Sequence, residues 1–159
     1  MKNLTFGNLI IIMRNLFLFA VYIVAISFIS CGKNTLGCMD PFAINYDKEA
    51  VESNESCIYH SDKFIGNYSV SDSCDYDSLR YSYNLTISQD QSSKNAIRIS
   101  NLHNAGQSIV AIAQDSSFSF PTQGDYQTGG GYLYDNNKIV INYFTTDSLN
   151  KFCSLYGSK

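Results

Sequence analysis

The chain has 159 residues and a formal net charge of −3 at pH 7, which suits one modest domain with additional segments. Lys2 and Arg14 are the charged residues of the first 30, so the remainder carries 9 basic and 14 acidic residues. Nucleic-acid binding demands a basic surface, and this composition excludes it as a main activity. The 12 Tyr and 10 Phe favour β-structure, because aromatic side chains fit pleated, half-buried surfaces.

The N-terminal segment has the anatomy of a secretory signal peptide. Residues 13–31, "MRNLFLFAVYIVAISFISC", start with a basic residue, continue with about a dozen apolar residues and end with small ones. The apolar run is shorter than the ~20 residues of a typical membrane span. We therefore predict that residues 1–30 are a signal peptide, beginning at either Met1 or Met13. The alternative is an uncleaved membrane anchor.

The last four residues of this segment, "FISC" at 28–31, resemble the lipobox of bacterial lipoproteins. Phe28 stands where Leu is commoner. The resemblance implies that Cys31 is acylated and becomes the first residue of the mature chain. Several acyl chains on one residue would hold the protein on a membrane, since each buried CH₂ contributes ~0.8 kcal/mol. The alternative is that Cys31 is a free or disulfide-bonded cysteine.

The remaining cysteines form an even set in an exported chain. Such a set predicts two disulfides, for which three connectivities are open. The four residues are Cys38, Cys57, Cys74 and Cys153.

Residues 37–59, "GCMDPFAINYDKEAVESNESCIY", form a short cysteine module. They resemble a small repeat of surface and secreted proteins of Bacteroidota, which runs Gly-Cys-x-Asp-Pro-x-Ala-x-Asn-Tyr and ends in Ser-Cys-x-Tyr. Ser53 and Glu55 depart from that repeat. The resemblance implies a Cys38–Cys57 disulfide, which would stabilise this coreless segment by ~3 kcal/mol. We assign residues 31–36 to a tether, 37–60 to the module and 61–159 to a separate domain.

The module also carries oxygen donors, of which Asp40, Asn45 and Asp47 are candidate Ca²⁺ ligands. No D-x-D-x-D-G calcium loop is present, so we expect no cofactor. The alternative, which we favour, is a solvated acidic loop in which Asp and Asn cap turns.

Beyond residue 60 the chain shows strand periodicity. In "SLRYSYNLTIS" at 78–88, apolar and aromatic residues alternate with polar ones, which predicts a half-buried strand. Similar short segments occur at 65–74, 96–102, 108–113, 118–120 and 132–144. Seven or eight short strands with short connections predict a small antiparallel up-and-down β-barrel, or else a sandwich. The run Gly129–Gly131 predicts a bend or bulge, with a loop as the alternative.

Residues 63–153 resemble a lipocalin-like barrel domain of Bacteroidota lipoproteins. The segments "FIGNYSVSDSC", "YNLTIS" and "IRISNL" and the late Cys153 carry this resemblance. Gly66-Asn67-Tyr68 resembles the lipocalin G-x-W feature, with Tyr in place of Trp. The resemblance implies a Cys74–Cys153 bridge.

Residues with obvious catalytic chemistry are scarce. His60 and His103 are expected at the surface, and Asp72, Asp75 and Asp77 in a solvated loop around Cys74. The cysteines are too dispersed, and too readily oxidised, to predict a zinc site. We therefore predict a non-enzymatic protein without catalytic residues. The enzyme alternative is a surface hydrolase with convergent acids such as Asp125 and Asp135.

Tyrosines are the best candidates for a ligand pocket, because each pairs an apolar ring with a polar hydroxyl. Such a pocket would suit a small apolar or sugar ligand, while the alternative is that the rings simply fill the barrel. The expected function is that of an outer-membrane lipoprotein, facing the periplasm or the surface, that binds a small molecule or a surface protein. The alternative is a structural, assembly or adhesion subunit. The pocket candidates are Tyr68, Tyr81, Tyr83, Tyr132 and Tyr143.

Overall fold

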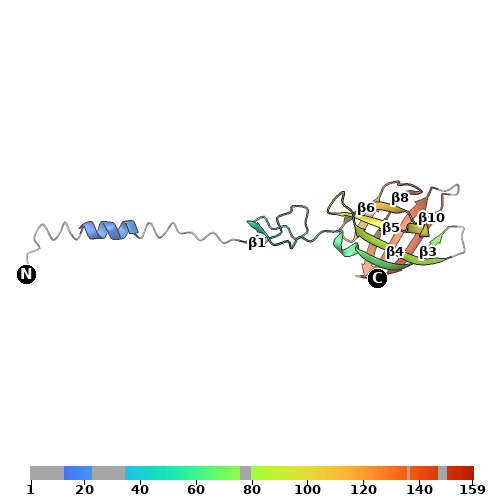
Figure 1. The fold of residues 1–159 in the computed structure, drawn as a ribbon, viewed down its shortest axis with the longest axis horizontal. Coiled ribbons are helices and arrows are strands. Elements are labelled where there is room, and N and C mark those ends of the chain that lie inside the picture. Colours follow the sequence, from blue (N-terminus) through green and yellow to red (C-terminus); the bar gives the residue numbers. More distant parts are fainter. Residues whose placement is uncertain (1–12, 23–34, 76–79, 136, 147–149) are drawn as a thin grey trace, which may run out of the picture. The chain divides into compact units, whose positions relative to one another are not determined.

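A computed structural model describes residues 13–22, 35–75, 80–135, 137–146 and 150–159 (Figure 1). Residues 13–22 are helical, and no helix in the described ranges is long and apolar enough to cross a membrane. Residues 36–159 form one compact unit. The predicted lipidation site Cys31, and Asp77, lie outside the described residues.

The cysteine module is held by a disulfide and by turns. Strands β1 (Leu36–Gly37) and β2 (Glu52–Ser53) have two residues each and pair in parallel. Cys38 is bonded to Cys57 and is buried. With so little apolar surface buried, the covalent bond takes the place of a hydrophobic core.

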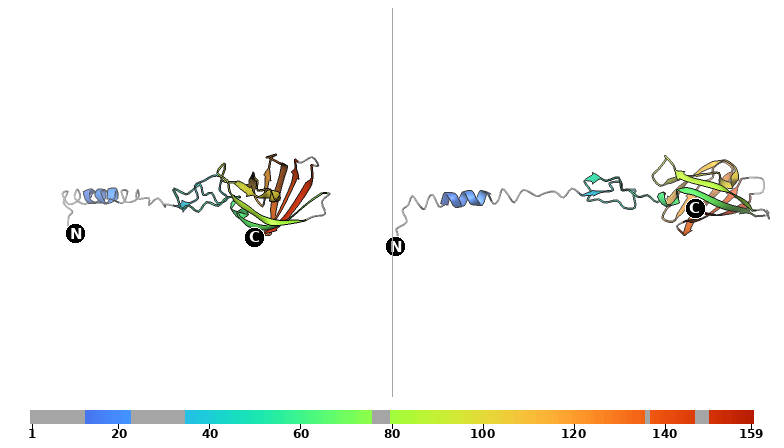
Figure 2. Two further views of the ribbon diagram at one scale, coloured as in Figure 1. Left: turned by 45° about the vertical axis from the view of Figure 1, so that its right-hand side comes forward. Right: turned by 60° about the horizontal axis from the view of Figure 1, so that its bottom comes forward.

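The rest of the chain folds into a closed antiparallel barrel of eight strands, in the order β10-β3-β4-β5-β6-β7-β8-β9. Figures 1 and 2 show the strands wrapping around one axis. Sequential neighbours pair from β3 to β10, and β10 closes the barrel on β3, so the predicted up-and-down barrel is confirmed and the sandwich alternative is wrong. The bounds are η1 Asp62–Phe64, β3 Gly66–Cys74, β4 Tyr81–Gln89, β5 Ala96–Ser100, η2 Leu102–Asn104, β6 Ser108–Gln114, β7 Ser117–Phe120, β8 Tyr126–Asp135, β9 Lys138–Thr145 and β10 Phe152–Ser158.

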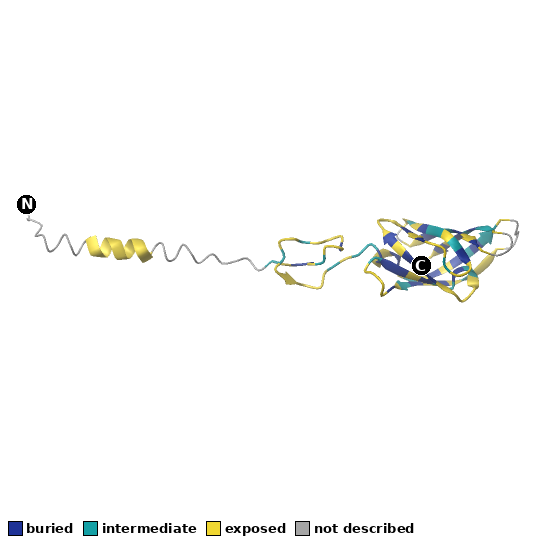
Figure 3. Ribbon diagram, turned by 90° about the horizontal axis from the view of Figure 1, so that it is seen from above, coloured by how far each residue is buried: buried dark blue, intermediate teal, exposed yellow. Residues whose placement is uncertain are grey.

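The interior is packed with side chains that alternate with outward-facing polar ones, as Figure 3 shows. In β4 the buried residues are Leu85 and Ile87, and Tyr83 is partly buried, as the alternation predicts. Tyr81, which shares this register, lies at the strand end and is exposed. The barrel is therefore filled by its own side chains over most of its length.

The run Gly129–Gly131 lies within β8, so the loop alternative is wrong. A register shift between Tyr126 and Gly129 marks an irregularity of the β-bulge kind, in agreement with the prediction. A Cβ at Gly129 or Gly131 would lie 2.5 Å from the ring of Phe120 or Phe118, respectively. The absence of side chains at these two positions lets both rings occupy the interior.

Cys74 and Cys153 are direct partners in the β3–β10 register and form the second disulfide. Both bonds implied by the two resemblances are thus present. This second bond joins the strands at which the barrel closes.

Candidate functional site

The site begins with Asp72, which lies inside one end of the barrel. In β3 the alternation that buries Tyr68 and Val70 also turns Asp72 inward, and its side chain is fully buried. The prediction that Asp72 lies in a solvated loop is therefore wrong, because the strand continues through Cys74. The alternation itself, continued by two residues from Val70, contains the signal that would have placed this carboxylate inside.

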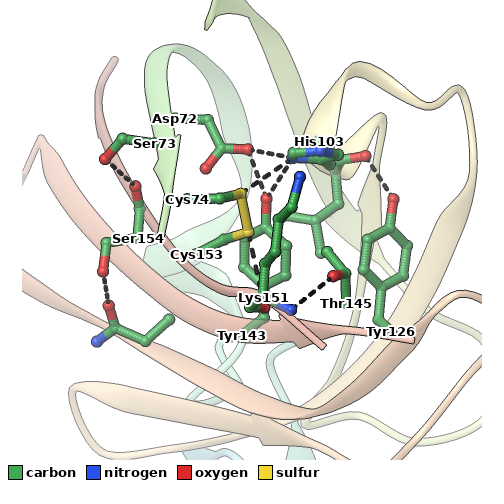
Figure 4. Close-up of a disulfide and its surroundings, with 12 residues drawn as sticks. Asp72, Ser73, Cys74, His103, Tyr126, Tyr143, Thr145, Lys151, Cys153 and Ser154 are labelled. Atoms are coloured by element: carbon green, nitrogen blue, oxygen red, sulfur yellow. Dashed lines mark hydrogen bonds and ion pairs between the residues drawn. A yellow bond between two sulfur atoms is a disulfide. The ribbon is translucent and has the colours of Figure 1, made fainter. Parts of the chain in front are cut away.

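Three groups surround one oxygen of this carboxylate (Figure 4). Asp72 Oδ2 accepts hydrogen bonds from the hydroxyls of Tyr143, at 2.5 Å, and Tyr83, at 3.2 Å. It lies 2.8 Å from Nδ1 of His103. The other oxygen, Oδ1, is buried and has no hydrogen-bond partner among the described residues. A buried polar atom without a partner is costly, so the arrangement calls for a physical reason.

His103 is held over Asp72 by an unusual backbone. Asn101, His103 and Asn104 have φ values of 66°, 57° and 53°, in the left-handed region. Asn tolerates this region, but a histidine there is uncommon, and such conformations concentrate at functional sites. The backbone N–H of His103 donates to the Tyr83 hydroxyl at 2.8 Å, which ties the loop to β4. The expectation of a plain surface histidine is wrong, since the fold places the ring against a buried carboxylate.

A pocket of about 270 Å³ opens beside this cluster. It is formed where η2 meets the start of β8 and the end of β9. Tyr126 donates its hydroxyl hydrogen to the carbonyl of Leu102 at 2.7 Å, so its ring forms a fixed wall (Figure 4). The lining residues are His103, Ala105, Asp125, Tyr126, Thr145 and Thr146.

The five predicted pocket tyrosines are not brought into one place. Tyr83 and Tyr143 meet at Asp72, next to the pocket. Tyr68 is part of the buried core, where its hydroxyl donates to the Phe64 carbonyl at 2.8 Å. Tyr81 and Tyr132 are each 45% exposed, and Tyr132 faces outward from β8. The sixth, Tyr126, lines the pocket directly, which only the fold could reveal.

Burial keeps the tyrosines of this cluster protonated. It raises the pKa of Tyr126 to about 12. It also raises the pKa of Tyr143 and of Tyr83 well above the usual value, and the negative charge of Asp72 adds to this effect. Both hydroxyls therefore act as hydrogen-bond donors to the carboxylate over the whole physiological range.

These shifts predict a loss of stability in alkali. Burial also raises the pKa of Tyr68 to about 12, against 10 for the unfolded chain. Above pH 10 the unfolded state releases tyrosine protons that the folded state retains, so the free energy of unfolding falls as pH rises from 10 to about 12. Each such tyrosine contributes up to about 1.4 kcal/mol per pH unit. Urea unfolding at a series of pH values, with tyrosinate absorbance recorded in parallel, measures this decline.

Asp72→Asn provides the comparison for that experiment. Because the Asp72 charge helps to raise the pKa of Tyr143 and Tyr83, its removal should shift the onset of tyrosinate formation to lower pH. Identical alkaline curves for the two proteins would contradict the proposed electrostatic coupling.

The candidate calcium ligands have local roles. Asp40 accepts hydrogen bonds from the Phe42 backbone N–H and from the Tyr59 hydroxyl, and these bonds lower its pKa. Asn45 bridges the carbonyl of Ser56 and the N–H of Ile58, at 2.6 and 2.8 Å. Similarly, Asp47 accepts from the N–H of Glu49. These contacts are the turn caps of the alternative that we favoured.

The acids named for the hydrolase alternative do not converge. Asp125 precedes the first residue of β8 and Asp135 is its last, so they lie at opposite ends of a ten-residue strand. Asp125 accepts a hydrogen bond from Gln107, whereas Asp135 faces Lys138. The specific pairing that this alternative needed is therefore wrong.

No protein-family model matches the chain, and no curated protein matches it. The functional argument rests on the geometry of the residues at this end of the barrel.

Proposed function

We propose that this protein is a lipid-anchored, non-enzymatic outer-membrane protein that binds a small hydroxyl-bearing molecule at the mouth of its barrel. The observation that carries the proposal is the pocket of about 270 Å³ beside the Asp72–His103–Tyr143 cluster. The packed interior argues against a ligand along the barrel axis, so the mouth replaces the axis as the expected location.

The chemistry of the lining suits a small sugar or a related polyol. Tyr126 offers an apolar ring, and Thr145, Thr146 and Asp125 bring hydroxyl and carboxylate oxygens to the same pocket. A mostly preformed site with one aromatic wall and a few polar groups is the usual design for small-molecule binding. At ~30 Å³ per water, the volume holds about nine waters, which limits the ligand to a small molecule.

The membrane anchor is supported by the sequence "FISC" and by the two disulfides, which fit an oxidising compartment outside the cytoplasm. Acylation of Cys31 would hold the mature chain on the membrane. Phase partition in detergent tests this: the wild-type protein should enter the detergent phase, and Cys31→Ala should remain aqueous. Equal partition of the two proteins would refute the anchor.

Native mass spectrometry tests the ligand. We would purify residues 31–159 with Cys31→Ser from a related bacterial host without stripping, and expect an adduct of low mass that denaturation releases. Ala105→Phe should abolish the adduct, because Ala105 is an exposed pocket residue and the larger ring would fill the space. Ser119→Phe is the matched control, because Ser119 faces outward from β7.

An adduct that survives in Ala105→Phe, or disappears in both variants, would locate binding elsewhere. A bare mass in the wild-type protein would favour the second candidate, a surface assembly or adhesion subunit. One observation supports that candidate: aromatic side chains are exposed on the outer face of three adjacent strands. These residues are Tyr132 and Tyr134 of β8, Phe144 of β9 and Tyr156 of β10.

A further inference from the structure

The Cys74–Cys153 disulfide lies directly beside His103 (Figure 4). The two sulfur atoms and a ring nitrogen of His103 all lie within 4.8 Å of one another. Cys74 Sγ is 4.0 Å from His103 Nδ1. Two thiolates and one imidazole are a recurrent zinc-binding set, with the fourth position left to water or another ligand. The sequence argued against a zinc site because its cysteines are dispersed, but the β3–β10 register brings two of them together.

We propose that reduction of this disulfide by a dithiol creates a Zn²⁺ site made of Cys74, Cys153 and His103. The dithiol supplies two electrons and two protons and is itself oxidised to a disulfide, while the Cys74–Cys153 bond breaks to give two thiols. Zinc then binds both sulfurs as thiolates, and two protons leave to solvent. In the oxidised protein the sulfurs are bonded to each other, so the site exists only in the reduced state.

The geometry requires only small movements. With Zn–S near 2.3 Å and Zn–N near 2.0–2.1 Å, tetrahedral ligand atoms lie roughly 3.5–3.8 Å apart. The 4.0 Å between Cys74 Sγ and His103 Nδ1 is close to this range already. The sulfurs must separate, which rotation of the two side chains accomplishes while the paired strands hold their Cα positions. Cys74 is partly exposed, so a dithiol has one sulfur to approach.

Asp72 gives the site a charge that favours a cation. Its carboxylate is fully buried, and Oδ2 lies 2.8 Å from the same nitrogen of His103. Oδ1 has no hydrogen-bond partner among the described residues. A divalent cation beside this carboxylate would offset the cost of burying an incompletely satisfied anion. This is a physical reason for the otherwise unexplained buried oxygen.

Cobalt is the probe for the test, because thiolate coordination to Co²⁺ gives a charge-transfer absorption band. The chain would contain residues 31–159, which include the whole compact unit, with Cys31→Ser to remove an unrelated thiol. The oxidised protein should show no such band. After reduction it should bind one cobalt per chain with the band present, and zinc should displace the cobalt.

Matched variants assign the ligands. Cys74→Ser/Cys153→Ser retains the Cys38 and Cys57 thiols as background and should lose the band. His103→Ala should weaken binding at least about tenfold and Asp72→Asn about tenfold, as loss of a supporting residue around a metal commonly does. The matched control His60→Ala, which changes the other histidine of the chain, should bind like the wild type.

Near-UV circular dichroism separates binding from folding. If the reduced chain keeps its barrel, the band must appear on addition of metal. If the reduced chain unfolds, metal must restore the tyrosine signal, because ligand binding to the folded state stabilises it. The proposal is overturned if reduced wild-type and Cys74→Ser/Cys153→Ser proteins respond identically to cobalt in either situation.

Discussion

Replacing Cys74 and Cys153 by serine should destabilise the barrel by about 4–5 kcal/mol. The bond closes a loop with a sequence separation of 79, and in the chain-entropy account a loop of that length strongly restricts the unfolded state. Small domains are stable by only about 5–15 kcal/mol, so the variant should approach the unfolding threshold. Urea denaturation followed by near-UV tyrosine dichroism measures the change.

The Cys38–Cys57 bond provides the internal comparison. It closes a loop with a separation of only 19, within the cysteine module. Cys38→Ser/Cys57→Ser should therefore leave the barrel transition far less affected than the first variant, because the closed sheet does not contain these residues. Equal shifts of the barrel transition would mean that the second disulfide does not hold the barrel closed.

The double variant Gly129→Ala/Gly131→Ala should cost roughly 4–6 kcal/mol, at about 2–3 for each overpacked position. An added Cβ at Gly131 would lie 2.5 Å from both the Phe118 ring and the Val140 carbonyl oxygen. At Gly129 it would lie 2.5 Å from the Phe120 ring. Neither the carbonyl nor the buried rings can move without disturbing the sheet or the core. Thermal and urea unfolding should both show the loss.

Two further variants locate the cause of this loss. Gly106→Ala adds a Cβ that meets nothing within 4 Å, although its φ of +69° is strained for alanine, so it should cost only about 1 kcal/mol. Phe118→Leu combined with Gly131→Ala should recover part of the loss by relieving the ring contact. If Gly106→Ala were as damaging as the double variant, backbone conformation rather than packing would be responsible.

The alternation of residues in β4 was sufficient to predict an antiparallel sheet. Leu85 and Ile87 are buried where the period of two places them, since successive side chains of a strand face opposite sides. The same rule, extended along β3, accounts for the buried position of Asp72. Local patterns of this kind depend only on neighbouring residues.

Sequence by itself determined that this protein is a β-protein, and the even set of four cysteines indicated two disulfides, whose partners came from resemblance. Only the tertiary structure decided that the sheet closes, that Tyr132 faces outward while Tyr126 lines a pocket, and that His103 meets Asp72. Asp72, His103 and Cys153 come from widely separated positions. Their proximity depends on strand register and on a loop in left-handed conformation, which no pattern of adjacent residues encodes.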